Sequence, residues 1–324
     1  MDLKQEILKI LEENRGESIS GTKLAKELYV TRSAVWKAIK SLQKEGYQIT
    51  AVTNKGYCLA PYNDIVSAES ISPYLKGRAK TFLLDVHHTI TSTNTVAKER
   101  AGQGAPEGTV VVAREQTEGR GRMGRSFYSP NGSGIYFSII LRPKLSIEDS
   151  LKITTAAAVA VARAIDTLAG VEAKIKWVND IFVHDKKVCG ILTEASLNFE
   201  NGGLEYAVVG IGINISTQDF PKEIEAIAGS IFSQKPGDTP ISSVLVAEVL
   251  NNIAEAMDSL TDCKYLEEYR RRSFLLGKNI LVIKGGQTIP AKAITIDDNA
   301  RLVVEYDDHT REALSSGEVS IRPQ

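Results

Sequence analysis

The chain has 324 residues, enough for two or three domains, and 43% of them are hydrophobic and 24% charged, as in an ordinary folded protein. A net charge of −1 excludes a molecule that binds nucleic acid through its overall charge. The longest apolar run, Ala156 to Ala162, is too short to span a bilayer, and the charged first residues do not fit a signal peptide. Neither the three widely separated cysteines nor the four histidines have metal-ligand spacing. We therefore expect a reduced, cytoplasmic protein with no membrane association and no structural metal.

Positive charge gathers at the N-terminal end, where residues 1–60 carry ten Lys and Arg against seven Asp and Glu. Apolar residues at helical spacing predict three helices there, over residues 3–13, 21–28 and 31–44, and Thr31 is a good N-cap for the third. Two short β-type runs follow on either side of Asn54-Lys55-Gly56, a hairpin-turn signal. Short helices joined by a brief turn and followed by a hairpin form a winged helix-turn-helix, which we place at residues 1–63.

The third of these helices presents the side chains that a DNA duplex would meet. Donors at the start of a helix in the major groove can read base edges, whereas lysines further along meet phosphates. We assign DNA binding to the outward positions of this helix and to the tip of the wing: Thr31, Arg32, Ser33, Lys37, Lys40 and Lys55. The alternative is a protein-interaction or regulatory cap, because exposed lysines are common on helices.

The most unusual segment runs from Gly119 to Arg125 and packs three glycines and three arginines into seven residues. Glycine lets backbone N–H groups approach an anion closely, and a guanidinium grips phosphate or carboxylate oxygens in pairs. Three cations this close repel one another unless something negative lies among them. Because a buried-strand run, Thr109 to Ala113, precedes the segment, we expect a flexible cationic loop that closes over an anionic ligand. The alternatives are a Gly/Arg-rich RNA-binding segment or a solvated loop.

The middle of the chain mixes strand and helix patterns. Strand patterns cover residues 82–86, 109–116, 134–141, 181–184, 187–194 and 206–214. Helix patterns start at residue 92 and cover residues 151–169, 242–260 and 265–275. Gly170 is a C-cap glycine for the 151–169 helix. The 134–141 run is apolar almost throughout, which predicts a strand buried on both faces. Together these patterns predict a mixed sheet with helices, and we place this domain at residues 64–276, with its boundary inside a polar connector at 61–73.

From Gly277 onward the pattern changes to short alternating runs. Turn signals such as Gly285-Gly286 and Asp297-Asp298-Asn299 separate five such runs. Short strands at this spacing predict a small antiparallel β-barrel, and we place it at residues 277–324.

Several polar or aromatic residues allow two interpretations each. Ser92-Thr93-Asn94 is either an N-cap run or the wall of a pocket that satisfies a small polar head group. Lys176 and Lys187 are either strand-edge lysines or anion ligands. Trp177 is either a core residue or a stacking platform, and Asn179-Asp180 is either a plain turn or part of a site.

Taken together, these segments resemble the family of bifunctional biotin–protein ligases that double as the biotin operon repressor. The motifs are Ser92-Thr93-Asn94, Gln116, Gly119–Arg125, Lys176-Trp-Val-Asn-Asp180, Lys187 before Val188-Cys-Gly190, and Gly210-Ile-Gly-Ile-Asn214. Val178 stands where the family usually has proline and Phe127 where tryptophan is common, so local loop geometry differs. The resemblance covers almost the whole chain. It implies an α+β fold with an N-terminal winged helix-turn-helix, a central class II synthetase-like mixed sheet with helices, and a C-terminal small SH3-like β-barrel.

The resemblance implies ligation in two steps. The carboxylate of biotin attacks the α-phosphate of ATP, which gives biotinyl-5′-AMP and pyrophosphate, and a lysine of a biotin carboxyl carrier domain then attacks the mixed anhydride. ATP and biotin are thus the expected substrates, with Mg²⁺ on the ATP phosphates. The adenylate, more than biotin, is expected to promote a homodimer whose paired winged helices bind a two-fold operator DNA.

The resemblance also carries residue roles. Arg120, Gly121 and Arg122 would contact the biotin carboxylate and the adenylate phosphate, and Arg125 would support the loop or pyrophosphate. Lys187 would bridge carboxylate and phosphate oxygens, and Asp180 would orient or deprotonate the incoming lysine. The implied catalytic residues are Lys187, Arg122, Arg120 and Asp180. The implied biotin and adenylate ligands are Ser92, Thr93, Asn94, Gln116, Gly119, Arg120, Gly121, Arg122, Arg125, Lys176, Trp177, Asn179, Lys187, Gly190, Gly212 and Asn214.

Two other classes of protein stay open. One is a ligand-sensing repressor without ligase activity, although a sensor of a neutral or singly charged metabolite would not need three arginines and Lys187. The other is a lipoate-type acyl ligase, because such enzymes resemble the same core.

Overall fold

The computed structural model describes residues 2–52, 55–146, 149–197, 203–237, 239–284, 286–315 and 318–321. Its contacts divide into two compact units, Met1–Lys76 with Gln234–Glu248, and Gly77–Ser233 with Val249–Gln324. Asn54 and Gly285, which the sequence predicts to lie in turns, are outside the described residues. No described helix is both long enough and apolar enough to cross a membrane.

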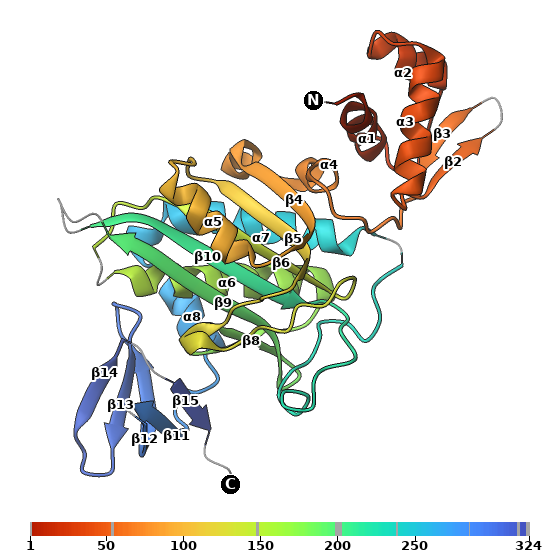
Figure 1. Ribbon diagram of the computed structural model, residues 1–324. Coiled ribbons are helices and arrows are strands. Elements are labelled where there is room, and N and C mark those ends of the chain that lie inside the picture. The colour runs from red at the N-terminus through yellow and green to blue at the C-terminus, as the bar shows by residue number, and fades with distance from the viewer. Residues whose placement is uncertain are drawn as a thin grey trace. The chain divides into compact units, whose positions relative to one another are not determined.

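The first unit contains the predicted helices and wing strands (Figure 1). Its winged-helix elements are α1 (Leu3–Glu13), β1 (Ser18–Ile19), α2 (Gly21–Glu27), α3 (Arg32–Lys44), β2 (Ile49–Val52) and β3 (Gly56–Leu59). The three strands form an antiparallel sheet of order β1-β3-β2. The sequence did not reveal β1, because two residues are too few to show a periodicity.

One apolar core holds these elements together. Ile7 and Leu11 of α1 and Ile39 of α3 are buried in the same cluster, which is why the apolar stripes predicted from the sequence face one another. Burying a side chain of this size stabilises the fold by about 1.5–3 kcal/mol. The hydroxyl of Thr31 accepts the N–H of Ala34 at 3.2 Å and caps α3 as predicted. Such a cap contributes about 1 kcal/mol.

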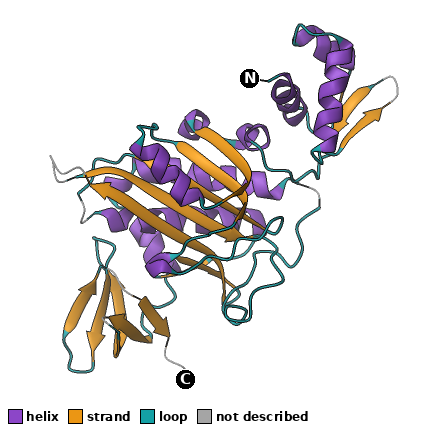
Figure 2. Cartoon of the chain, viewed as in Figure 1, coloured by secondary structure: helices purple, strands orange, loops and turns teal. Residues whose placement is uncertain are grey.

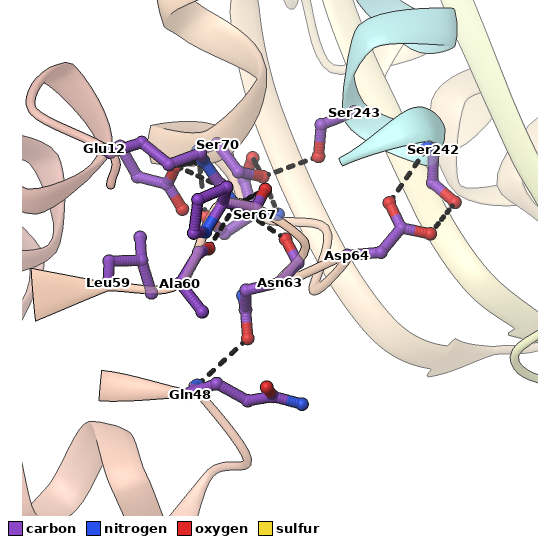
Figure 3. A network of polar contacts seen from close by, with 12 residues as sticks. Glu12, Gln48, Leu59, Ala60, Asn63, Asp64, Ser67, Ser70, Ser242 and Ser243 are labelled. Carbon is purple, nitrogen blue, oxygen red and sulfur yellow. Dashed lines mark hydrogen bonds and ion pairs between the residues drawn. The ribbon is translucent and has the colours of Figure 1, made fainter. Parts of the chain in front are cut away.

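The segment after the wing is bound into the first unit by hydrogen bonds (Figure 3). Asp64 accepts the backbone N–H of Ser242 at 2.9 Å and its hydroxyl at 2.7 Å, in the first turn of α7 (Ile241–Asp258). A carboxylate is favourable there because a helix N-terminus carries partial positive charge. In α4 (Ala68–Ile71), the hydroxyl of Ser70 lies 2.7 Å from that of Ser243. The connector therefore packs on the start of α7.

Arg15 ties α1 to the same connector. Its guanidinium pairs with Glu12 and donates to the carbonyls of Pro61 at 3.2 Å and Asn63 at 2.8 Å. Burial raises the pKa of Glu12, and the neighbouring Arg15 opposes that shift. The Asn63 side chain in turn accepts the N–H of Gln48 at 3.0 Å (Figure 3).

The second unit is built on a seven-stranded mixed sheet of order β4-β5-β6-β10-β9-β8-β7. Its strands are β4 (Leu83–Ile90), β5 (Thr109–Gln116), β6 (Gly134–Leu141), β7 (Lys174–Lys176), β8 (Asp180–Val183), β9 (Lys186–Leu197) and β10 (Leu204–Asn214). Of these strands, β4 and β5 run parallel and the other neighbours antiparallel. Every residue of β6 is buried, which confirms the predicted burial on both faces.

Helices cover the two faces of this sheet (Figure 1). On one face α5 (Thr93–Gly102) packs Ala97 and Ala101 on β5, β6 and β10. On the other lies α6 (Ser150–Ala169), where Thr154 donates to Thr193 of β9 at 2.8 Å. Gly170 ends α6 with a φ of 64°, the left-handed C-cap that the sequence predicts. Helix α8 (Tyr265–Arg272) packs on α6.

The C-terminal part of this unit is a five-stranded antiparallel sheet of order β14-β13-β12-β11-β15. Its strands are β11 (Asn279–Lys284), β12 (Gln287–Ile296), β13 (Leu302–Tyr306), β14 (Arg311–Leu314) and β15 (Glu318–Ile321). They match the five alternating runs predicted from the sequence. Ile280, Val282, Leu302 and Val304 are buried, since alternate residues of each strand face the same side. Figure 2 shows this end of the chain as strands without helices.

Candidate active site

A cavity of about 420 Å³ opens in the second unit. It is lined by residues from the start of α5, the Gly/Arg segment, the ends of β7 to β10 and the segment after β10. The predicted site residues that line it are Ser92, Thr93, Asn94, Gln116, Arg120, Gly121, Arg122, Arg125, Lys176, Trp177, Asn179, Asp180, Lys187, Gly190, Gly212 and Asn214. Gly119 is not in the lining. The fold thus gathers side chains that are up to 122 positions apart in the sequence, from 92 to 214.

The Gly/Arg segment is a tight hairpin on the rim of this cavity. The carbonyl of Gly119 accepts the N–H of Phe127 at 2.8 Å, and Gly121 donates to the carbonyl of Arg125 at 2.7 Å. Met123, with a φ of 54°, occupies the tip, and its side chain is 74% exposed. We refer to residues 119–127 as the Gly/Arg hairpin. Its glycines allow two backbone runs to approach closely, and its three arginines line the cavity.

Three cations of the cavity each contact a partner from their own chain. Arg120 Nη1 lies 3.8 Å from Glu194 Oε1, Arg122 Nη1 donates to Asn179 Oδ1 at 3.2 Å, and Lys187 Nζ lies 2.7 Å from Asp180 Oδ1. We call these the cavity cations: Arg120, Arg122 and Lys187. Of the arginines in the Gly/Arg hairpin, Arg120 has an acidic partner, Glu194, whereas Asp180 is the acidic partner of Lys187. The sequence had identified Asp180 but not Glu194.

At one end the cavity wall is a network of short polar side chains. Gln116 Oε1 accepts the Thr93 N–H at 2.8 Å and the Thr93 hydroxyl at 3.1 Å, and Gln116 Nε2 donates to Ser129 at 2.9 Å. The hydroxyl oxygen of Ser138 lies 2.8 Å from that of Thr93. Ser92 holds the N-cap position of α5, but its side chain makes no capping bond. Because its hydroxyl does not cap the helix, Ser92 can serve a ligand instead. Ser92 thus occupies the N-cap position of α5, as one interpretation predicted, but its side chain does not act as a cap.

The Lys176–Asp180 segment forms another part of the wall. Trp177 is 4% exposed and donates its indole N–H to the carbonyl of Ala300 at 3.1 Å, so it is a core residue that also lines the cavity. The hydroxyl of Tyr269 donates to the carbonyl of Val178 at 3.0 Å, and Asn179 Nδ2 donates to the main chain of β9 at 2.8 Å. The peptide bond before Val178 is cis. The hydrogen bond from Asn179 Nδ2 to β9 fixes this side chain, so its oxygen meets Arg122 from a fixed position.

Phe127, Gly190 and Gly212 form the centre of the cavity. A Cβ added to Gly212 would lie 2.5 Å from the Phe127 ring, so the ring packs directly on the backbone of β10. Asn214 Nδ2 donates to the carbonyl of Gly229 at 3.0 Å. This bond holds the segment after β10 against the sheet, as does the 2.8 Å bond from the Lys187 N–H to the Ile227 carbonyl.

Sequence reasoning missed part of the lining. Phe127, Gly210 and Ile211 had been noted in the motifs but not assigned as ligands, and the missed residues are Ser126, Tyr128, Ile191, Leu192, Phe220, Ile224, Ile227, Ala228, Ile283 and Val319. Those at 220–228 lie in a segment without periodicity, and Ile283 and Val319 come from the C-terminal sheet. Among the described residues there is no group of three or more His, Cys, Asp or Glu that could hold a metal ion.

The electrostatic state of Glu194 follows from its contacts. Burial raises the pKa of its carboxyl, but the hydrogen bonds from Lys98 and Asn94 outweigh burial, and the pKa falls below its ordinary value. Glu194 is therefore an anion at neutral pH, able to balance the charge of Arg120.

In the first unit, the predicted DNA-binding residues are all exposed: Thr31, Arg32, Ser33, Lys37, Lys40 and Lys55. The sequence missed Trp36, which is 51% exposed and lies one helical turn from both Arg32 and Lys40. We call Arg32, Ser33, Trp36, Lys37 and Lys40 the α3 face. Thr31 uses its hydroxyl to cap α3, so its oxygen is already engaged.

Three stretches of the chain match known families. Residues 86–214 match the Biotin/lipoate A/B protein ligase family, residues 4–58 match an HTH domain, and residues 275–322 match the Biotin protein ligase C terminal domain. This order defines a class of protein, a protein ligase for small carboxylic acids that carries a DNA-binding domain in front of its catalytic core.

Individual relatives identify the family within this class of protein ligases. The chain is 36% identical over 322 residues to the bifunctional ligase/repressor BirA of Bacillus subtilis, covering 97% of each chain, and 27% identical over 310 residues to BirA of Escherichia coli, covering 95% and 94%. The biotin protein ligase of Aquifex aeolicus in complex with biotin and ATP aligns with a TM-score of 0.62 and 26% identity, over 75% of this chain and 99% of that one. The chain belongs to the family of bifunctional biotin–protein ligases and repressors. The predicted α+β fold class is confirmed.

Proposed function

We propose that this chain joins biotin to a lysine of a biotin carboxyl carrier domain through biotinyl-5′-AMP. The observation that supports this most directly is the convergence of the three cavity cations beside a wall of small polar side chains. In the first step a carboxylate oxygen of biotin attacks the α-phosphorus of ATP, the α–β anhydride bond breaks and pyrophosphate leaves. In the second step the lysine amine attacks the acyl carbon, and AMP leaves.

The cavity cations suit the first step because two anions must be brought together against their repulsion. Arg120 and Arg122, with Gly121, hold the carboxylate and the α-phosphate, and Lys187 bridges their oxygens. Partners that fix these cations in advance reduce the reorganisation needed when charge builds up on the phosphate. Arg125 supports the hairpin or the leaving pyrophosphate.

The polar end of the cavity suits the head group of biotin. Ser92, Thr93, Asn94 and Gln116 offer donors and acceptors to the ureido ring, while Phe127 packs along the aliphatic chain. The path between the polar end of the cavity and the nucleotide is lined by Lys176, Trp177, Asn179, Gly190, Gly212 and Asn214. Asp180 holds Lys187 in place and then orients or deprotonates the lysine of the carrier domain.

Mg²⁺ enters this scheme with the nucleotide. The described residues provide no carboxylate cage, and Asp180 is already paired with Lys187. Phosphate oxygens and water therefore hold the ion, which neutralises charge on the phosphates. Asn179 and the cavity cations then act on the same phosphates from the protein side.

The second activity is repression. We propose that the α3 face and Lys55 contact operator DNA, and that the adenylate, more than biotin, promotes a homodimer that places two winged helices on a two-fold operator. The cationic α3 face supports this, because phosphate contacts from lysines supply affinity and the first residues of the helix reach base edges. Equal operator affinity with and without the adenylate would rule out this coupling.

The ligase proposal is tested by incubating the chain with biotin, ATP and Mg²⁺ and following the adenylate by mass spectrometry. Biotin-dependent ATP–pyrophosphate exchange is expected as well. If neither appears while biotin still binds, the chain is a sensor without ligase activity. Competition between biotin and lipoate for the cavity distinguishes a lipoate-type ligase, for which lipoate would bind more tightly.

A further inference from the structure

Glu194 of β9 contacts side chains from two separate parts of the second unit. Its Oε1 lies 2.7 Å from Lys98 Nζ and 3.8 Å from Arg120 Nη1, and its Oε2 accepts the amide of Asn94 at 3.0 Å. Asn94 and Arg120 line the cavity, whereas Glu194 is not among the lining residues. Any effect of Glu194 on a ligand must therefore pass through Asn94 or Arg120.

Asn94 is held on every side. Its Nδ2 also donates to the carbonyl of Leu192 at 3.2 Å, and its Oδ1 accepts the hydroxyl of Ser138 at 2.6 Å. A Cβ added to Gly210 would lie 1.8 Å from that oxygen, so the amide packs directly on the backbone of β10. With both amide hydrogens used, the orientation of Asn94 depends on the acceptor that Glu194 supplies.

We propose that Glu194, held by Lys98, is a positioning residue that fixes Asn94 and Arg120 together, an inference that rests on the proposed ligase function. In that function Asn94 meets the ureido head of biotin and Arg120 meets its carboxylate. Glu194 thus sets the spacing between two groups that grip opposite ends of one substrate.

Charge explains why a carboxylate is needed at this position. Lys98 and Arg120 approach the same oxygen, and a neutral side chain would leave two cations facing each other without a counter-charge. Glutamine, with one acceptor oxygen, cannot serve Asn94, Lys98 and Arg120 together. Lys98 keeps the carboxylate aligned with both Asn94 and Arg120.

The experiment measures binding of biotin and of biotinamide, which has a neutral amide in place of the carboxylate, by calorimetry without ATP. Asn94→Ala is expected to weaken both ligands by the same factor, and Arg120→Met to weaken biotin alone. Glu194→Gln is expected to weaken both ligands at least tenfold, and biotin more than biotinamide. A general loss of structure would not produce this difference between the two ligands.

Each other result overturns a defined part of the proposal. Equal losses for the two ligands in Glu194→Gln would remove the link to Arg120, a loss for biotin alone would remove the link to Asn94, and wild-type binding of both would remove the proposal entirely. Wild-type chain that forms the adenylate shows that the proposed function survives such a failure. If wild-type chain forms none, the proposed function itself fails.

Three further variants complete the design. Glu205→Gln is the matched control, since Glu205 is an exposed glutamate of the adjacent strand that accepts from Ser196 at 3.0 Å, and binding is expected to be unchanged. Lys98→Met is expected to give the Glu194→Gln pattern in weaker form, and it tests the proposal even if Glu194→Gln does not fold. The double variant Lys98→Met/Glu194→Gln is expected to match Glu194→Gln alone. Additive losses would show that Lys98 does not act through Glu194.

Discussion

The cavity cations and the cations of the α3 face differ in how the chain holds them. Each cavity cation contacts an acid or an amide of its own chain, at distances from 2.7 to 3.8 Å. The α3 face is exposed, and its cations take part in none of the ion pairs found among the described residues. The cavity cations are held by partners before a ligand arrives, whereas the cations of the α3 face are free to adjust.

This difference matches the ligand proposed for each set of cations. A small substrate whose charge develops at one point gains most from groups already in place, because reorganising them would add to the barrier. A DNA backbone presents many equivalent phosphates, and affinity comes from the release of counterions as lysines approach. Long, solvated side chains suit that task, since no single geometry has to be held.

Among the cavity cations, the largest effect is expected from Lys187→Ala. Loss of a preorganised group that stabilises developing charge typically lowers a rate by about 10²–10³, and we expect that loss in adenylate formation, measured by pyrophosphate exchange. Lys174→Ala, at an exposed lysine of β7, is the control and should react at the wild-type rate. A wild-type rate in Lys187→Ala would exclude Lys187 from the mechanism.

A smaller effect is expected from Arg122→Gly. This change removes the guanidinium bonded to Asn179 and leaves the hairpin more flexible, so the adenylate should dissociate about tenfold faster. Release is measured by rapid dilution of the preformed complex, and escaped adenylate should label lysines of bystander proteins. Unchanged retention would mean that the hairpin does not close over the intermediate.

The cations of the α3 face are tested by the salt dependence of the affinity for operator DNA. Lys37→Ala and Lys40→Ala should each reduce the slope of log affinity for operator DNA against log salt by about one, while the ligase rates stay at the wild-type level. Lys9→Ala, at an exposed lysine of α1, serves as the control. A slope change as large for Lys9 as for Lys37 would show that general charge, not the α3 face, contacts the phosphates.

The smallest effect concerns pH. The pKa of Glu194 is lowered in the folded chain, so its stabilising contribution is present above its unfolded pKa of about 4.3 and is lost as the pH falls through the lower folded value. Glu194→Gln should therefore be less stable than wild type at neutral pH, by about 1 kcal/mol or less, and the gap should close in acid. Urea unfolding followed by Trp177 fluorescence in a Trp36→Phe background measures it. A gap that is constant with pH would contradict the assignment.

Much of the fold could be predicted because the signals are local. The stripe of Ile7 and Leu11, the cap at Thr31 and the apolar run of β6 each lie within a few residues and have one physical solution. The Gly/Arg hairpin was conspicuous for the same reason. A two-residue strand such as β1 has no such signal.

The partners of the cavity cations could not be predicted from residue patterns. Glu194 lies 100 positions from Asn94, and its role arises when β9 pairs between β8 and β10 and turns alternate side chains toward α5. Trp36 was missed for the opposite reason, because a large aromatic in an amphipathic helix normally faces the core. Whether a residue is buried depends on neighbours that the local pattern does not contain.

The Asp64 carboxylate limits how the chain can be divided. Helix α7 begins among the residues that group with the first 76 positions and ends among those that group with the catalytic sheet. A protease cut after Lys76 would leave the opening turn of α7 without its acceptor, and frayed helix ends expose unsatisfied backbone groups. The DNA-binding unit and the ligase unit therefore share helix α7, and a single cut after Lys76 cannot yield two intact units.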